Sequence, residues 1–108
     1  MKIKVSELTT DQLDWAVTKC EGGSAQSPGE LTDDEYYSTE WTLGGPIIER
    51  EGISVICHTS GNHWAARTKE YGAIYIEGPT PLIAAMRCYV VSKMGEEVDV
   101  PDELGVRE

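Results

Sequence analysis

The chain has 108 residues, 40% of them hydrophobic and 26% charged, which is the composition of an ordinary soluble domain. This length predicts one domain with a single core, and no apolar run approaches the roughly 20 residues of a membrane span. The formal net charge is −10, and 11 of the 19 acidic residues lie in segments 30–40 and 96–108. The rest is near neutral and has no basic patch, which excludes the usual phosphate contacts to duplex nucleic acid.

The three cysteines are Cys20, Cys57 and Cys88, and their wide spacing matches no zinc-binding pattern. We expect buried free thiols and no metal site. The N-terminal lysines are not followed by the apolar stretch of a secretory signal, so we expect a cytosolic location and no membrane partner.

The first predicted helix runs from Thr9 or Thr10 to Cys20. Thr9 and Gln12 have the spacing of a capping box, and the pair Gly22-Gly23 ends the helix. Before this helix, residues 2–5 are either a short strand or an extended lead-in. After it, residues 22–38 are rich in Gly and Ser and show no periodicity, so we predict a loop.

Residues 38–52 allow two interpretations. A helix can run through most of 40–51 despite Pro46, or Gly44-Gly45 can form a turn with a short helix beginning at Pro46. We favour the helix through 40–51, with 44–46 as its weak point.

Three β-rich segments follow, separated by turn residues. Segment 53–58 is apolar on both faces and predicts a buried strand, and 63–68 and 73–77 predict its antiparallel neighbours. The expected product is a three-stranded meander with neither face open to water.

The last helix is predicted over residues 81–94, with Thr80 as its N-cap, Pro81 at its first position and Gly95 after its end. Only Pro81, Arg87, Ser92 and Lys93 of this segment are not apolar, and they share no face. Such a helix is either fully buried under other elements or shared with a second subunit, and we expect a homo-oligomer through 81–94.

The order α-α-β-β-β-α predicts an α+β fold in which a small three-stranded antiparallel sheet packs with about three helices, as two layers or a sandwich. We expect a single domain over residues 1–95 and an acidic C-terminal tail over 96–108. The tail is expected to lie along the body and to fray at its end.

Three phrases of the sequence resemble one family. They are SELTTDQLDWAVTKCEGG, STEWTLGGPIIEREGISV and GPTPLIAAMRCYVVSKMGEEVDVP. Together they resemble the NinX-like accessory proteins of lambdoid and related tailed phages, and more distantly the phage ABA-sandwich domain. The resemblance implies a phage origin, an accessory role in the host cytoplasm and a counter-defence setting. It brings no catalytic residues with it.

No catalytic motif is recognisable in the sequence. His58 and His63 flank a turn, and the adjacent Cys57 and His58 would point to opposite faces of a strand. There is no nucleophile elbow, P-loop or dinucleotide fingerprint. We therefore expect no enzyme activity, no catalytic residues and no cofactor.

The sequence also allows an anion-binding site, against the alternative in which the glycines only permit turns, the tryptophans are core residues and Arg87 pairs with an acid such as Glu49. Segments 44–46 and 78–81 are glycine-led approaches to helix starts, where backbone N–H groups can hold a phosphate. Arginines supply guanidinium donors and tryptophans supply surfaces for stacking a base. The candidate ligand-binding residues are Trp41, Gly45, Arg50, Trp64, Arg67, Thr80 and Arg87.

Two functions remain open at this point. The first is non-catalytic binding of a host or phage protein, which the apolar 81–94 helix and the acidic segments would serve. The second is a sponge that sequesters a small nucleotide, such as an immune signal of the host.

Overall fold

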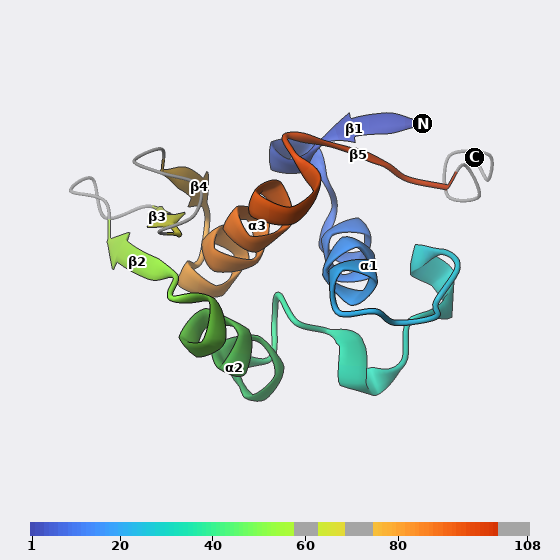
Figure 1. Ribbon diagram of the computed structural model, residues 1–108, viewed down its shortest axis with the longest axis horizontal. Coiled ribbons are helices and arrows are strands. Elements are labelled where there is room, and N and C mark those ends of the chain that lie inside the picture. Colours follow the sequence, from blue (N-terminus) through green and yellow to red (C-terminus); the bar gives the residue numbers. More distant parts are fainter. Residues whose placement is uncertain (58–62, 69–74, 102–108) are drawn as a thin grey trace.

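Helix α3 (Pro81–Met94) lies at the centre of the computed structural model, which describes residues 1–57, 63–68 and 75–101 (Figure 1). Helices α1 (Thr10–Cys20) and α2 (Trp41–Glu51) pack against it, and so does the three-stranded sheet. Figure 1 shows the sheet and α1 on opposite sides of α3. The predicted α+β class, with a small antiparallel sheet and three helices, is confirmed.

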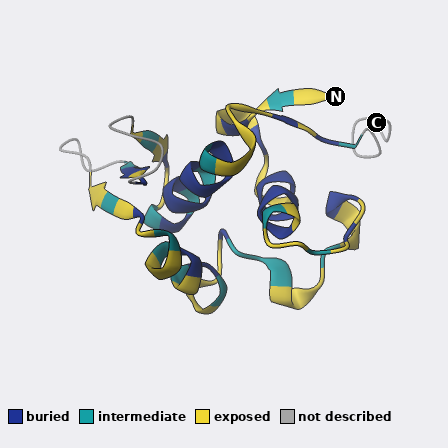
Figure 2. Cartoon of the chain, viewed as in Figure 1, coloured by how far each residue is buried: buried dark blue, intermediate teal, exposed yellow. Residues whose placement is uncertain are grey.

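The sequence of α3 sets both its ends and its burial. Thr80 Oγ1 accepts a hydrogen bond from the Ile83 N–H at 3.1 Å, and Gly95 after the helix has a φ of 91°. Most residues of α3 are buried, as the dark blue of Figure 2 shows. They are Leu82, Ala84, Ala85, Met86, Cys88, Tyr89, Val90 and Val91. The apolar surface on which we based a shared subunit contact is thus covered within one chain.

Helix α1 begins with the predicted capping box. The Gln12 N–H donates to Thr9 Oγ1 at 3.2 Å, and the Thr9 N–H donates to Gln12 Oε1 at 3.0 Å. The segment after α1 contains two short 3₁₀ turns, η2 (Pro28–Glu30) and η3 (Asp33–Glu35). Trp15 Nε1 donates to the Ala25 carbonyl at 3.1 Å and holds this segment against α1.

Helix α2 confirms the interpretation that carried a helix through Pro46. Its C-cap is Gly52, with a φ of 66°. Gly44 is buried where α2 meets α3, and a Cβ there would lie 2.6 Å from Leu82 Cδ1 and 2.6 Å from the Tyr37 carbonyl oxygen. Glycine at this position therefore permits the close approach of the two helices.

The sheet is the predicted meander of β2 (Ser54–Cys57), β3 (Trp64–Arg67) and β4 (Ile76–Gly78), all antiparallel. Val55, Ala66 and Ile76 are register partners, so their side chains share one face. This face packs on the core around α3. Within the described residues, the third strand covers 76–78, one residue past the predicted end at 77. His58 and residues 73–74 lie outside the described residues.

The prediction that neither sheet face is open to water is wrong. Ser54, Ile56 and Cys57 of β2 are exposed, Ile56 by 47%. The predicted burial of all three cysteines is also wrong, because Cys57 is exposed and Cys20 is half-buried, whereas Cys88 is buried. The apolar sequence of segment 53–58 predicted burial, but β2 is an edge strand and α3 covers the sheet from one side.

A second sheet joins the two ends of the fold. β1 (Lys2–Lys4) pairs antiparallel with β5 (Glu97–Asp99), and the N-terminal amine reaches the Asp99 carboxylate at 2.9 Å. The 3₁₀ turn η1 (Val5–Glu7) follows β1. The strand option for residues 2–5 is confirmed over 2–4, and the segment assigned to the tail begins as a strand. Val98 and Val100 bury their side chains in the core.

Replacing Gly44 by Ala should lower the free energy of unfolding by about 1–3 kcal/mol, because the new Cβ overpacks a site closed by a backbone oxygen. Gly45→Ala is the matched control. Its Cβ would meet nothing closer than the Trp41 ring at 4.0 Å. Alanine at position 45 gains about 0.8–1.0 kcal/mol of helix propensity, and the steric clash of a residue that precedes proline offsets part of this gain. Urea unfolding monitored by circular dichroism measures both variants. Equal losses would contradict the close-packing role of Gly44.

Candidate functional site

The structure disperses the seven predicted ligand-binding residues over several places. Trp41 and Thr80 come together at the starts of α2 and α3, and Arg50 lies at the end of α2. Trp64 and Arg67 stand at opposite ends of β3. The remaining two are Gly45 and Arg87. These residues do not form one pocket.

Gly45 does not lie where the anion-site hypothesis needed it. It is an interior residue of α2, which begins at Trp41, four positions earlier. Its backbone N–H is therefore not at a helix start. Segment 44–46 forms no anion cradle, because the helix continues through Pro46 rather than beginning there.

Arg50 is fully engaged in an ionic network that joins all three helices. Its NH1 and NH2 groups donate to the two carboxylate oxygens of Glu21 at 3.2 and 2.7 Å, and its Nε donates to Glu51 at 2.9 Å. NH2 also donates to the Tyr89 hydroxyl at 3.1 Å, and that hydroxyl donates to Glu21. The hydrogen bond from Arg50 lowers the pKa of Glu21. Arg50 thus acts as a structural tie between α1, α2 and α3.

Trp41 and Thr80 border a small hollow of about 260 Å³. Ser38, Thr39, Pro81, Leu82 and Ile83 complete its lining. Trp41 is 54% exposed, but the Thr80 hydroxyl is already used to cap α3. Pro81 offers no N–H at the next position. The hollow therefore has a stacking surface and few free donors.

Trp64 and Arg67 serve the sheet. Trp64 is half-buried against the core, on the face that meets α3. Arg67 is exposed, and its guanidinium carbon lies 5.4 Å from the centre of the Tyr75 ring. These two residues lie on opposite faces of β3, because they are three positions apart in the strand.

Arg87 lines an open cleft of about 570 Å³ between α3 and the edge strand β4. Its NH1 group donates to the Glu77 carbonyl at 2.9 Å, while its buried Nε has no hydrogen-bond partner. Desolvation lowers the pKa of Arg87, and no carboxylate contributes to that shift. Ser6, His63, Tyr75, Ile76, Glu77, Gly78 and Pro79 form the rest of the lining. The cleft therefore holds a half-buried cation that forms no ion pair with an acid in the part of the chain that the structure describes.

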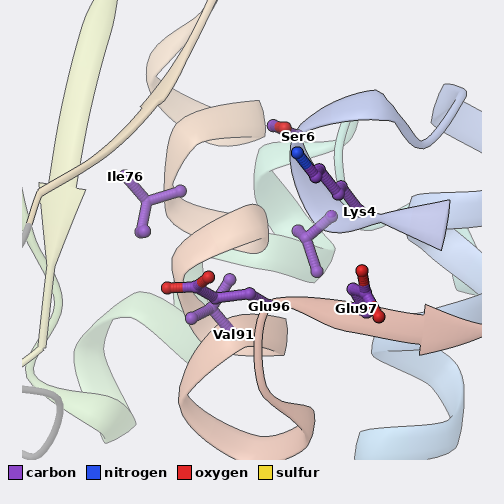
Figure 3. A pocket seen from close by; sticks show the side chains of 7 residues that line it. Lys4, Ser6, Ile76, Val91, Glu96 and Glu97 are labelled. Atoms are coloured by element: carbon purple, nitrogen blue, oxygen red, sulfur yellow. The ribbon is translucent and has the colours of Figure 1, made fainter.

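A second cleft of about 600 Å³ continues the first (Figure 3). Ser6 and Ile76 line both clefts, so together they form one groove. Figure 3 shows β4 with Ile76 on one side of α3 and the β1–η1 segment with Ser6 on the other. The second cleft adds Lys4, Val5, Val91, Glu96 and Glu97. We call the combined feature the Arg87 groove.

Chemically, the Arg87 groove suits recognition of an anion beside an apolar surface. A half-buried guanidinium forms strong, directional hydrogen bonds to carboxylate or phosphate groups. His63 Nε2 lies 3.7 Å from Glu77 Oε1, which is longer than a direct hydrogen bond. Among the described residues, no group of three or more His, Cys, Asp or Glu side chains is arranged to hold a metal ion.

Sequence reasoning found Arg87 but missed the walls of its groove. Lys4, Ser6, Ile76, Glu96 and Glu97 come from three distant segments, which only the β1–β5 pairing and the position of β4 bring together. The i, i+4 spacing of Arg87 and Val91 was the one available signal, because it places both side chains on one face of a helix.

Asp14 is a second residue that sequence reasoning did not single out. It is 1% exposed, and its Oδ1 accepts the Ser38 N–H at 2.8 Å. Burial raises the pKa of Asp14 from 3.8 to about 6, although its hydrogen bonds with Ser38 oppose the rise. This carboxylate anchors the end of the loop after α1 where it returns to the core.

Comparison with known proteins gives one positive result. The family model described as Bacteriophage P22, NinX matches residues 4–93, which is most of the chain. The chain belongs to the Bacteriophage P22 NinX family. It is therefore a small phage accessory protein, as the NinX-like phrases of its sequence indicated. No curated protein matches the chain.

In the part of the NinX-family chain that the structure describes, no helix is both long enough and apolar enough to cross a bilayer. The family match covers η1, α1, α2, the three-stranded sheet and α3 up to Lys93, and it stops before β5. Arg87 and Val91 lie inside the matched region, whereas Glu96 and Glu97 lie outside it. The groove thus combines residues from inside and from outside the region that the family model matches.

The stability of the protein should increase as the pH falls from 7.5 to 5, because of Asp14. The folded-state pKa of Asp14, about 6, exceeds the value of 3.8 expected for the unfolded chain. The folded state therefore binds a proton that the unfolded state does not bind between these values. Between pH 7.5 and 5 the gain should be about 1.4 kcal/mol, because pH 5 lies about one unit below the folded-state pKa and still above the unfolded-state value. Urea unfolding across this range measures it.

Asp14→Asn is the matched control for this pH dependence. Its side-chain oxygen can still accept the Ser38 N–H, but it carries no charge at any pH. The variant should be more stable than the parent at pH 7.5, and the difference should shrink toward pH 5. A parallel pH dependence in both proteins would contradict the assignment to Asp14.

Proposed function

We propose that this phage accessory protein acts by non-catalytic binding, holding part of a host or phage protein in the Arg87 groove. The observation that carries the proposal is the half-buried guanidinium of Arg87, which lines the groove and has no carboxylate among its described contacts. A partly desolvated charge is costly unless it is paired. An anionic group of a partner would supply the missing pair.

Two features support binding rather than catalysis. A nucleophilic site needs a nucleophile within hydrogen-bond reach of a base, whereas His63 lies beside the Glu77 carboxylate at 3.7 Å. Arg87 is also fixed to the groove wall through the Glu77 carbonyl, which suits rigid recognition. We place this binding in the host cytoplasm during infection, in an accessory or counter-defence role consistent with the family.

A photo-crosslinking amino acid at Ser6 should capture the partner in infected cells, because Ser6 is exposed and lines both halves of the groove. Adding Arg87→Gln should reduce the adduct about tenfold or more, since a hydrogen bond to a charged group is worth about 1.5–3 kcal/mol. Gel shift and mass spectrometry read out the adduct.

The same crosslinker at Glu49 is the position control, because Glu49 is exposed on α2 and lines none of the three cavities described above. An adduct that persists unchanged in Arg87→Gln, or one that forms equally from Glu49, would refute binding in the groove.

The second candidate is sequestration of a small nucleotide. The Arg87 cleft also contains Tyr75, whose ring is 43% exposed, so a guanidinium and an aromatic surface border one cavity. Such a pair can hold a phosphate and a base. The dispersal of Trp41, Arg50 and Arg67 weighs against this candidate relative to protein binding.

Thermal unfolding with a panel of cyclic and ADP-ribose-type nucleotides tests this second candidate. A nucleotide present at 100 times its Kd should add about 2.7 kcal/mol of stability. For a chain of this size, that is a rise in Tm of roughly 10 °C or more. Arg87→Gln should abolish the rise. If no nucleotide raises Tm, sequestration is excluded and protein binding stands alone.

A further inference from the structure

We infer that the Arg87 groove selects an extended peptide segment of its partner by an acidic side chain followed, two residues later, by an apolar one. This inference rests on the proposed function and names the chemistry of the partner. It comes from the order of groups along α3, because the two halves of the groove follow that helix from Arg87 to Val91.

The first position of the motif is set by charge. Arg87 makes one hydrogen bond, to the Glu77 carbonyl, and no ion pair among the described residues. Among the described residues, the other side chains that line the cleft and can carry a charge near neutral pH are Glu77, whose side chain is 60% exposed, and His63. Glu77 Oε1 lies beside His63 rather than bonding the guanidinium. A carboxylate of the partner is the planar acceptor that a guanidinium binds best.

The second position is set by the apolar floor. Val91 lies one helical turn after Arg87, and Val5 and Ile76 face it from the two walls of the same cleft. Four residues of α-helix advance about 6 Å. Two residues of an extended strand advance about 6.6 Å, and side chains at i and i+2 point to the same face. An acid at i and an apolar residue at i+2 therefore match Arg87 and Val91 together.

The far end of the groove is mixed in charge. Glu96 and Glu97 stand there with Lys4, which is the register partner of Glu97 in the β1–β5 pair. Because the lysine offsets part of the acidic charge, this end does not fix a third position. The motif is limited to the acid and the apolar residue.

Selection of random seven-residue peptides displayed on immobilised full-length protein tests the motif. The expected result is enrichment of Asp or Glu followed at i+2 by Val, Ile, Leu or Met, with at least tenfold less recovery on Arg87→Gln. Arg87→Glu should reverse the first preference to Lys or Arg. Lys19→Glu, an exposed change of equal charge outside the groove, should leave the selected sequences unchanged. Circular dichroism confirms that each variant is folded, and Arg87→Gln alone suffices if Arg87→Glu does not fold.

Three results would overturn the inference, and they bear differently on the proposed function. Peptides that depend on Arg87 but lack the acid, or carry it at another spacing, overturn the motif and leave groove binding intact. The motif is also wrong, and groove binding still stands, if only nucleotides and no peptides bind at Arg87. If no peptide is enriched on the parent protein relative to the Ser6→Trp variant, in which the tryptophan blocks the groove, the inference is wrong. The crosslinking experiment at Ser6 then tests independently whether a partner binds in the groove.

Discussion

The fold depends on the need to bury one helix from every side. α3 has no polar face, and eight of its 14 residues are buried, so a single sheet cannot cover it. The chain meets this need by placing α1, α2, the three-stranded sheet and β5 around it. Small residues make the enclosure tight: Ala84 and Ala85 are fully buried, and a Cβ on Gly78 would lie 2.7 Å from the Ala84 nitrogen. Each buried CH₂ group of this helix contributes about 0.8 kcal/mol of hydrophobic stabilisation.

The sequence predicted well where the signal is local. The Thr9 capping box, the Thr80 cap and the turn-separated strands are written in residues a few positions apart, and the structure has them where they were expected. Prediction failed where the outcome depends on distant neighbours. Ile56 is as apolar as a core residue, yet it is 47% exposed on the edge strand β2. The pairing of β1 with β5 could not be predicted from the sequence, because strands of three residues are too short to show a periodic pattern.

The candidate site shows the same division. Arg87 was recognisable as a guanidinium on an otherwise apolar helix, and the structure adds that its only described hydrogen bond is to the edge strand β4. Arg50 looked equally available in sequence, yet Glu21, Glu51 and Tyr89 occupy its donors. Whether an arginine is free for a ligand is decided by tertiary contacts, which residue type and spacing do not contain. Gly45 failed for a related reason, since a helix that tolerates Pro46 moves its own start to Trp41.

The β1–β5 pair has a consequence for the order of folding. The N-terminal amine and Asp99 are 98 positions apart, and closing a loop of that length costs about 4 kcal/mol of chain entropy. During synthesis, β1 leaves the ribosome first but cannot find its partner until β5 follows. Lys4 and Ser6 on one side and Glu96 and Glu97 on the other are brought to the groove by this late step. A chain in which β5 has not yet been made lacks one wall of the groove, so we expect binding only after β5 pairs with β1.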